Sequence, residues 1–143
     1  MSNISGVSRE TFLSNSNLKI SPTQIRSFNN LIARRAIRKE PVAYLLNKKE
    51  FWSIKFNVNK DVLIPRPETE ILVESLVKYY KGHDPFILDI GTGSGCIIIS
   101  LLQELKKSKG VAIDISKKAL KIAKKNSKDL NVFKRIKFVK TSI

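Results

Sequence analysis

The chain has 143 residues, of which 42% are hydrophobic, enough for one ordinary domain or for a small lobe joined to part of another. No apolar run approaches the ~20 residues of a membrane span, and the first residues lack the basic and apolar regions of a secretory signal. We therefore expect a cytoplasmic protein without a membrane segment. One Cys and one His are too few for a Cys/His metal site, so we predict no metal.

The net charge of +15 would suit a polyanionic partner. It comes mostly from lysines along predicted helices and segment ends, without the interleaved arginines and aromatics of RNA-binding patterns. We therefore favour a solvated lysine-rich surface and expect no direct contact with nucleic acid, although a partner near the ribosome would also be compatible. The lysines concerned are Lys106, Lys107, Lys117, Lys118, Lys121, Lys124, Lys125, Lys128, Lys134, Lys137 and Lys140.

Residues 1–50 are predicted to form a small helical lobe. A short helix is possible at residues 8–13. Ser21 is a suitable N-cap for a second helix, and Pro22 suits its first position. Pro41 ends this helix or restarts the chain. The apolar residues that follow Pro22 at helical spacing are Ile25, Phe28, Leu31, Ile32 and Ile37.

Residues 51–65 are predicted to form a β-hairpin that links the lobe to the rest of the chain. Apolar and polar residues alternate from Trp52 to Val58, as in a half-buried strand. The segment Asn59-Lys60-Asp61 has turn chemistry. Val62-Leu63-Ile64 would then supply the returning strand.

A proline-rich segment opens the third region, residues 66–143. The prolines on either side of Arg66 fix the backbone and hold this residue extended. Pro67 and Glu68 suit the first turn of a helix. That helix is predicted to run to Tyr79, with Gly82 available to cap its end.

The strongest pattern in the chain is the glycine loop Gly91-Thr92-Gly93-Ser94-Gly95. It follows an apolar run, Phe86–Ile90, and precedes a second one, Ile97–Leu105, which predicts a buried parallel strand, a tight turn and a helix. Glycines allow positive φ and a close approach of a ligand to the backbone. The free N–H groups that open the helix point into the same space, so the segment predicts a nucleotide-type site.

The details of this loop limit the ligand. The third glycine, Gly95, comes one position too early for the dinucleotide pattern Gly-X-Gly-X-X-Gly, and the Gly-Lys-Ser/Thr ending of a P-loop is absent. The carboxylate of Asp89 would repel a pyrophosphate but suits a ligand with a cationic amino group. S-adenosylmethionine has such a group and no phosphate. The neighbouring Cys96 is interpreted as a small packing residue rather than a nucleophile.

A second strand is predicted at Gly110–Asp114. Asp114 lies 23 positions after Gly91, close to the ~20-residue spacing of an acid that binds ribose hydroxyls, although an acid at a strand end can also cap the next turn. Ser116 is the predicted N-cap of the next helix, and Arg135–Val139 is the predicted third strand. Three parallel strands with two crossovers make half of a doubly wound α/β sheet, so the first strand should lack a partner on one edge.

At this point the chain resembles the glutamine-N5 methyltransferases that modify peptide chain release factors, a family of class I methyltransferases that use S-adenosylmethionine. The resemblance runs from about Ser21 to Val139. One departure is Asn47, where the family usually has a glycine. The blocks that carry the resemblance are Arg34-Arg35, Pro41-Val42-Ala43-Tyr44, Glu50-Phe51-Trp52, Leu63-Ile64-Pro65-Arg66-Pro67-Glu68-Thr69-Glu70 and Ile87-Leu88-Asp89-Ile90-Gly91-Thr92-Gly93-Ser94-Gly95-Cys96-Ile97.

The resemblance implies a fold, a cofactor, a partner and a set of site residues. It implies a Rossmann-like class I sheet, S-adenosylmethionine as cofactor and a release factor as partner, with Arg66, Pro67 and Glu68 as a possible wall of the active site. The adenine contact of the family would fall near Ser142 or Ile143. The residues implied for cofactor binding are Asp89, Gly91, Thr92, Gly93, Ser94, Gly95 and Asp114.

The motif Asn-Pro-Pro-Tyr, which binds the target glutamine in the family, does not occur in these 143 residues. We therefore assign no catalytic residue and interpret the chain as the N-terminal part of such an enzyme, inactive when alone. The alternative is a non-catalytic remnant that binds the cofactor or another partner.

Overall fold

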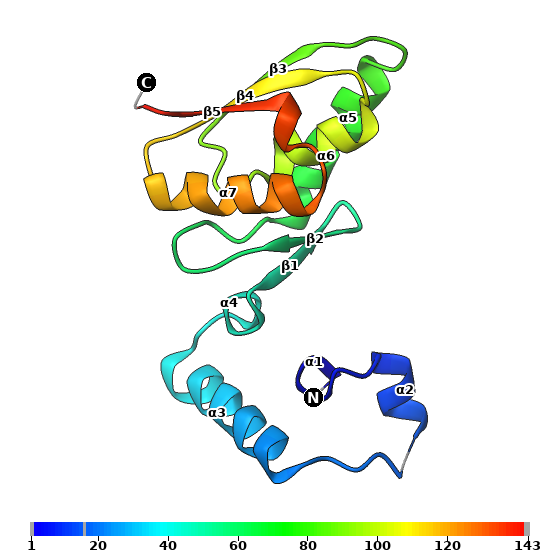
Figure 1. Ribbon diagram of the computed structural model, residues 1–143, viewed down its shortest axis with the longest axis vertical. Coiled ribbons are helices and arrows are strands. Elements are labelled where there is room, and N and C mark those ends of the chain that lie inside the picture. The colour runs from blue at the N-terminus through cyan, green and yellow to red at the C-terminus, as the bar shows by residue number, and fades with distance from the viewer. Residues whose placement is uncertain (1, 16, 142–143) are drawn as a thin grey trace. The chain divides into compact units, whose positions relative to one another are not determined.

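The computed structural model describes residues 2–15 and 17–141. The chain forms two compact units, Met1–Leu46 and Asn47–Ile143 (Figure 1). Ser142 and Ile143, the positions suggested for an adenine contact, lie outside the described residues. Within the described ranges, no helix has both the length and the apolar character needed to cross a membrane.

The first unit is helical, with α1 (Ser2–Ser5), α2 (Arg9–Ser14), α3 (Pro22–Arg38) and α4 (Val42–Leu46). The predicted start of α3 is confirmed, because the Ser21 side chain accepts a hydrogen bond from the Gln24 backbone and the Gln24 side chain returns one to Ser21. After α3, Arg34 and Glu40 form a two-pronged ion pair with distances of 2.8 and 2.6 Å. Helix α4 was not predicted from the sequence.

The hairpin lies earlier in the chain than the alternating pattern indicates. Its strands are β1 (Lys48–Phe51) and β2 (Ile54–Asn57), which pair antiparallel with Phe51 opposite Ile54. Trp52 and Ser53 form the two-residue turn. The prediction of a returning strand at residues 62–64 is therefore wrong, because these residues form no strand. The predicted turn at residues 59–61 is present, with the Val62 N–H donating to the Asn59 carbonyl at 3.2 Å.

Side chains from two helices hold this unexpected turn. Trp52 and Ser53 both have positive φ, 53° and 55°, as a tight hairpin turn requires. The backbone N–H of Trp52 donates to Glu70 Oε1 at 3.0 Å, and its indole N–H donates to Glu104 Oε1 at 2.8 Å. The stabilising contacts of the turn thus come from residues far along the chain.

The rest of the second unit follows the predicted order of elements. The three strands are parallel and lie in the order β3-β4-β5, so the predicted half of a doubly wound sheet is confirmed. The elements are the short 3-10 helix η1 (Pro67–Thr69), α5 (Glu70–Tyr79), β3 (Phe86–Ile90), α6 (Cys96–Glu104), β4 (Lys109–Asp114), α7 (Lys117–Asp129), η2 (Phe133–Arg135) and β5 (Ile136–Lys140). The residue that caps the end of α5 is Tyr80, and not Gly82.

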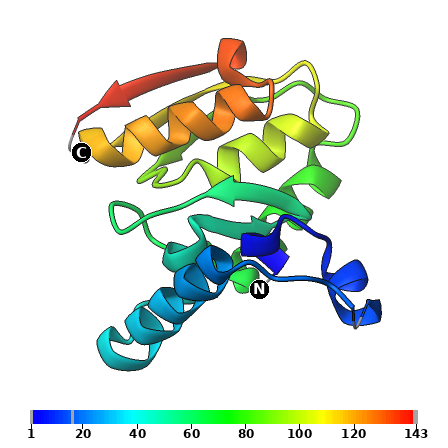
Figure 2. The ribbon, with the colours of Figure 1, turned by 60° about the horizontal axis from the view of Figure 1, so that its bottom comes forward.

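The helices of this unit cover one face of the sheet, with the hairpin packed beyond them (Figures 1 and 2). The core lies between these layers. Phe51 and Phe56 of the hairpin meet edge to face there, with ring centroids 6.2 Å apart. The buried core residues are Phe51, Phe56, Val73, Ile98, Ile99, Leu101, Leu102, Ala112, Val132 and Ile136.

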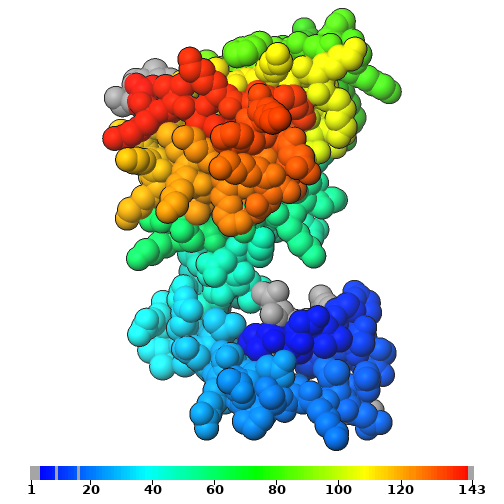
Figure 3. Space-filling model, in the orientation of Figure 1, coloured from blue at the N-terminus to red at the C-terminus, as the bar shows by residue number. Residues whose placement is uncertain are grey.

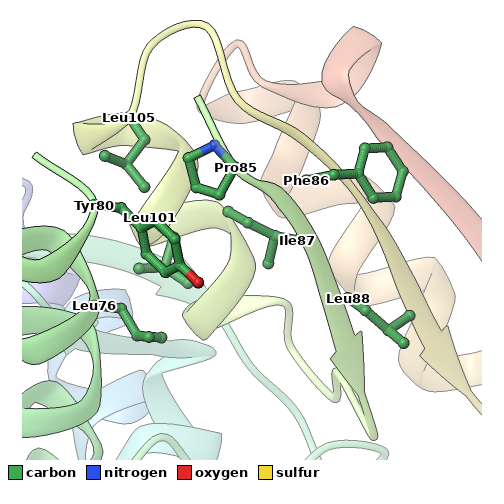
Figure 4. Close-up of a pocket in the computed structure, with 8 residues that line it drawn as sticks. All are labelled: Leu76, Tyr80, Pro85, Phe86, Ile87, Leu88, Leu101 and Leu105. Carbon is green, nitrogen blue, oxygen red and sulfur yellow. The ribbon is translucent and has the colours of Figure 1, made fainter. Parts of the chain in front are cut away.

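The other face of the sheet is open in the described part of the chain. On β3 the side chains of Phe86, Leu88 and Ile90 are 72%, 57% and 58% exposed. The outer edge of β3 also pairs with no described strand. An apolar pocket of about 220 Å³ lies beside β3, where Ile87 points toward α5 and α6 while Phe86 and Leu88 point away (Figure 4).

Candidate cofactor site at the glycine loop

The glycine loop joins β3 to α6 at the carboxyl end of the sheet. Gly91, Gly93 and Gly95 have φ of 73°, 54° and 80°, so all three use the left-handed backbone that favours glycine. The N–H groups of Gly91 and Thr92 both donate to the carbonyl of Ile113, at 2.9 Å each. These two hydrogen bonds attach the loop to the end of β4. The predicted order of strand, turn and helix is confirmed.

The three glycines differ in the space around them. A Cβ at Gly91 would meet nothing within 4 Å, and a Cβ at Gly93 would meet only the Gly91 carbonyl oxygen at 3.9 Å. A Cβ at Gly95 would lie 2.8 Å from Ile99 Cδ1 and 3.2 Å from Ala123 Cβ. Gly95 therefore serves helix packing, whereas the open surface over Gly91 and Gly93 fits the close approach of a ligand to the backbone.

Asp114 ends β4 directly beside the loop. Its Oδ2 accepts a hydrogen bond from the Gly93 N–H at 2.9 Å, and its Oδ1 accepts one from the Ser116 N–H at 2.8 Å. Each carboxylate oxygen retains capacity for a further hydrogen bond. The side chain therefore combines the two roles considered from the sequence: it caps the next turn and leaves acceptors for hydroxyl groups.

Asp89 lies beneath the loop rather than on its surface. The residue is 8% exposed, and its Oδ2 accepts a hydrogen bond from the Thr92 hydroxyl at 2.7 Å. Burial raises the pKa of this carboxyl, and the hydrogen bond from Thr92 opposes that shift. A cationic group close to Asp89 would favour the ionised carboxylate and so offset the cost of its burial.

The sequence interpretation missed one residue that shapes the loop, Asn126 of α7. Its side chain is 1% exposed and donates to the carbonyl of Ser94 at 2.8 Å and to that of Asn57 at 3.0 Å. Its Oδ1 accepts from the backbone and side-chain amides of Asn57, at 2.8 and 2.7 Å. A polar residue on the apolar face of an amphipathic helix was the available signal.

The remaining predicted residues lie as follows. Arg66, Pro67 and Glu68 are exposed around the start of η1, and no hydrogen bond or ion pair among the described residues joins them to the loop. Cys96 is partly buried at the start of α6, and burial raises the pKa of its thiol, which disfavours a nucleophilic thiolate. Asn47 has φ of 52°, a conformation that asparagine tolerates well, so the departure from glycine is accommodated.

The site therefore offers open backbone over two glycines, a carboxylate with free acceptors at a strand end, and a buried acid below. The loop lacks the Gly-Lys-Ser/Thr ending with which a P-loop binds phosphates. Among the described residues, no cluster of His, Cys, Asp and Glu is suited to hold a metal ion. These features match a nucleoside ligand with a cationic tail better than a phosphorylated one.

Each of the two units contains a match to a known family. Residues 84–143 match the family described as a methyltransferase domain, and residues 1–46 match the PrmC N-terminal domain. The chain is 41% identical over 128 residues to the release factor glutamine methyltransferase of Caulobacter vibrioides, a match that covers 89% of this chain and 44% of that protein.

A second relative and a solved structure extend this comparison. The release factor glutamine methyltransferase of Buchnera aphidicola subsp. Schizaphis graminum is 41% identical over 138 residues, 96% of this chain and 50% of that protein. The chain thus spans about half the length of the curated relatives it matches. The N-terminal domain of human METTL16 in complex with SAH is 26% identical with a TM-score of 0.51, covering 80% of this chain and 44% of that one.

Proposed function

The chain belongs by sequence to the release factor glutamine methyltransferase family, and on this premise we propose that its glycine loop binds S-adenosylmethionine. The cofactor would lie over Gly91 and Gly93, with its ribose hydroxyls donating to Asp114. Thr92, Ser94 and Gly95 would shape the loop, and the amino group of the cofactor would approach the end of β3 near Asp89. When bound, S-adenosylmethionine supplies a methyl group for transfer.

The observation that carries this proposal is the pair of hydrogen bonds at Asp114. Its carboxylate is fixed by Gly93 and Ser116 before any ligand arrives, yet each oxygen can accept another hydrogen bond. A prepositioned acceptor loses little entropy on binding a ribose. The open glycine surface beside it gives the adjoining part of the ligand access to the backbone.

For the substrate, we propose a glutamine side-chain amide of a peptide chain release factor, in the cytoplasm where translation terminates. Catalysis of such a transfer rests on holding the amide nitrogen in line with the donor. Arg66, Pro67 and Glu68 are exposed and available to form one wall of that site. The support for this proposal is the named relatives, which match this chain over most of its length.

We further propose that the 143-residue chain, by itself, binds the cofactor but does not methylate. The motif that holds the target glutamine in the family is absent from these residues. Without it, bound cofactor would face no positioned nucleophile.

Two measurements test the proposals separately. Calorimetry with S-adenosylmethionine and with NAD should give binding of the first and none of the second; the reverse result would contradict the cofactor assignment. Labelled S-adenosylmethionine with a release factor should give no labelled product from this chain alone. Addition of the C-terminal half of a relative should restore labelling if the chain is catalytically competent, and labelling by the chain alone would show that its catalytic groups have been misplaced.

A further inference from the structure

The surface shared by α7 and β5 carries charges that the proposed cofactor site does not use. Lys117, Lys121, Lys124 and Lys128 stand at positions i, i+4, i+7 and i+11 of one helix, so they share a single face. This stripe spans ~16 Å of the helix axis. Figure 3 shows α7 in orange beside the red β5 on the face turned to the viewer.

Two phenylalanines lie next to this stripe. The rings of Phe133 and Phe138 are stacked, with centroids 6.0 Å apart and planes at 20°. Lys124 Nζ lies 5.7 Å from the Phe138 centroid, and Lys128 Nζ lies 5.0 Å from the Phe133 centroid. Folding therefore interleaves lysines and aromatic rings that stand apart in the sequence.

The stripe and β5 together form a groove of about 510 Å³, lined by Lys117, Leu120, Lys121, Lys124, Phe138 and Lys140. None of its lysines, nor Lys128, forms an ion pair within the described residues. The lysines on another side of α7 do: Lys125 lies 2.6 Å from Asp129, and Lys118 lies 3.8 Å from Asp61. Positive charge is thus left uncompensated on the groove side of the helix.

We propose that this groove and the adjoining Phe133 bind single-stranded RNA, which reverses the expectation from the sequence of no direct contact with nucleic acid. Lysine ammonium groups at this spacing would contact successive phosphates. Phe133, which is 37% exposed, would stack with a base. An acidic protein surface would use the lysines but gain nothing from a stacking platform, so the aromatic pair favours a nucleic acid.

This inference is independent of the proposed cofactor site. The groove lies at β5, the opposite edge of the sheet from β3. Among the described residues, no hydrogen bond or ion pair joins a side chain of the groove to the glycine loop. Cofactor binding and RNA binding can therefore be lost separately, and the failure of one proposal leaves the other standing.

The test is a fluorescence anisotropy titration of the full chain with a labelled single-stranded RNA of about 12 nucleotides, within the size range of single-strand sites. Contacts to up to five phosphates predict a slope of log K against log salt of about −2 to −3.5. Lys121→Glu/Lys124→Glu should weaken binding at least about tenfold. Lys106→Glu/Lys107→Glu changes the net charge equally at exposed lysines elsewhere and should weaken it less than about threefold.

Phe133→Leu separates RNA from other polyanions, because it keeps an apolar side chain and all the lysines. It should weaken RNA binding about five- to tenfold through lost stacking, with an unchanged thermal midpoint. An undiminished affinity in this variant, or equal competition by polyglutamate, would reassign the groove to an acidic protein. Equal loss in both double-lysine variants would overturn a localised site altogether.

Discussion

The backbone N–H of Gly93 donates a hydrogen bond of 2.9 Å to Oδ2 of Asp114, a residue 21 positions later in the chain. This bond joins the two features from which a cofactor site was predicted, the glycine loop and the acid at the end of the next strand. Asp114 is therefore a positioning group for the loop as well as a proposed ligand group. A change at either residue should affect the other.

Asp114→Ala should weaken adenosine-containing ligands but not free methionine. Loss of a charged hydrogen bond costs about 1.5–3 kcal/mol, and two ribose hydroxyls are involved. Calorimetry with S-adenosylmethionine, adenosine and methionine measures the difference. Ser116→Ala is the control, since it removes only the N-cap of α7, at about 1 kcal/mol of stability. Equal weakening of adenosine and methionine would assign Asp114 a purely structural role.

Gly93→Val and Gly95→Ala should separate binding from folding. At Gly93 a Cβ would meet only the Gly91 carbonyl oxygen, at 3.9 Å, so the fold loses about 1–2 kcal/mol for a left-handed residue while the ligand surface is blocked. At Gly95 the new Cβ collides with Ile99 and Ala123, which adds about 1–3 kcal/mol of overpacking. Circular dichroism should show the larger drop in melting temperature for Gly95→Ala. Unchanged calorimetric affinity in Gly93→Val would refute the assignment of the loop.

Asp89→Asn should stabilise the ligand-free protein at neutral pH. Because burial raises the pKa of Asp89 above its ordinary value of 3.8, the folded state holds this proton more tightly than the unfolded state. The free energy of unfolding therefore falls as the pH rises from below 3.8, the ordinary pKa, through the raised pKa of the folded state. Asparagine stays neutral and still accepts from Thr92, so its advantage in melting temperature should be larger near pH 7 than near pH 4.

The control for that experiment is Asp84→Asn, at an exposed position, which should change the midpoint little at either pH. An Asp89→Asn advantage of the same size at both values would mean that charge burial is not its cause. The same variant should bind S-adenosylmethionine more weakly if the amino group of the ligand is held near Asp89.

The chain should self-associate through β3. This strand has an edge that pairs with no described strand and three large apolar side chains exposed on one face, a combination that invites pairing with another chain. Leu88→Lys should shift sedimentation toward the monomer without lowering the melting temperature. Leu63→Lys, at a leucine outside the strand that is 72% exposed, should not. Monomeric wild-type chain at all accessible concentrations would contradict this expectation.

The sequence predicted the sheet well because each of its elements carries a local signal. Ser21 and Ser116 cap their helices as expected, and the Phe86–Ile90 strand ends where the first glycine stands. Such signals depend on residues within one turn of each other. They give the order of elements, and the right-handed crossover rule then gives the parallel sheet.

The hairpin could not be predicted in the same way. Asn59 and Asp61 do form the local turn that their chemistry favours, with the Asp61 N–H donating to Asn59 Oδ1 at 2.9 Å. The hairpin turn at Trp52 and Ser53 instead has two positive φ values without a glycine or asparagine. The partners of the turn, Glu70 and Glu104, are distant in sequence, so no residue near the turn indicates where it forms. The place of Asn126 on the apolar face of α7 is a local signal, but its partners, Asn57 and Ser94, become evident only when the three segments meet.

The carboxamide of Asn126 couples two parts of the second unit that would otherwise open independently. A two-stranded hairpin is barely stable in isolation, and its Asn57 backbone is held by the same side chain that holds the Ser94 carbonyl. A ligand that tightens the loop must therefore slow hydrogen exchange at the hairpin amides, and local unfolding of the hairpin must lower affinity at the loop. Because such linkage is reciprocal, changes in the stability of the hairpin should change the affinity of the proposed binding site.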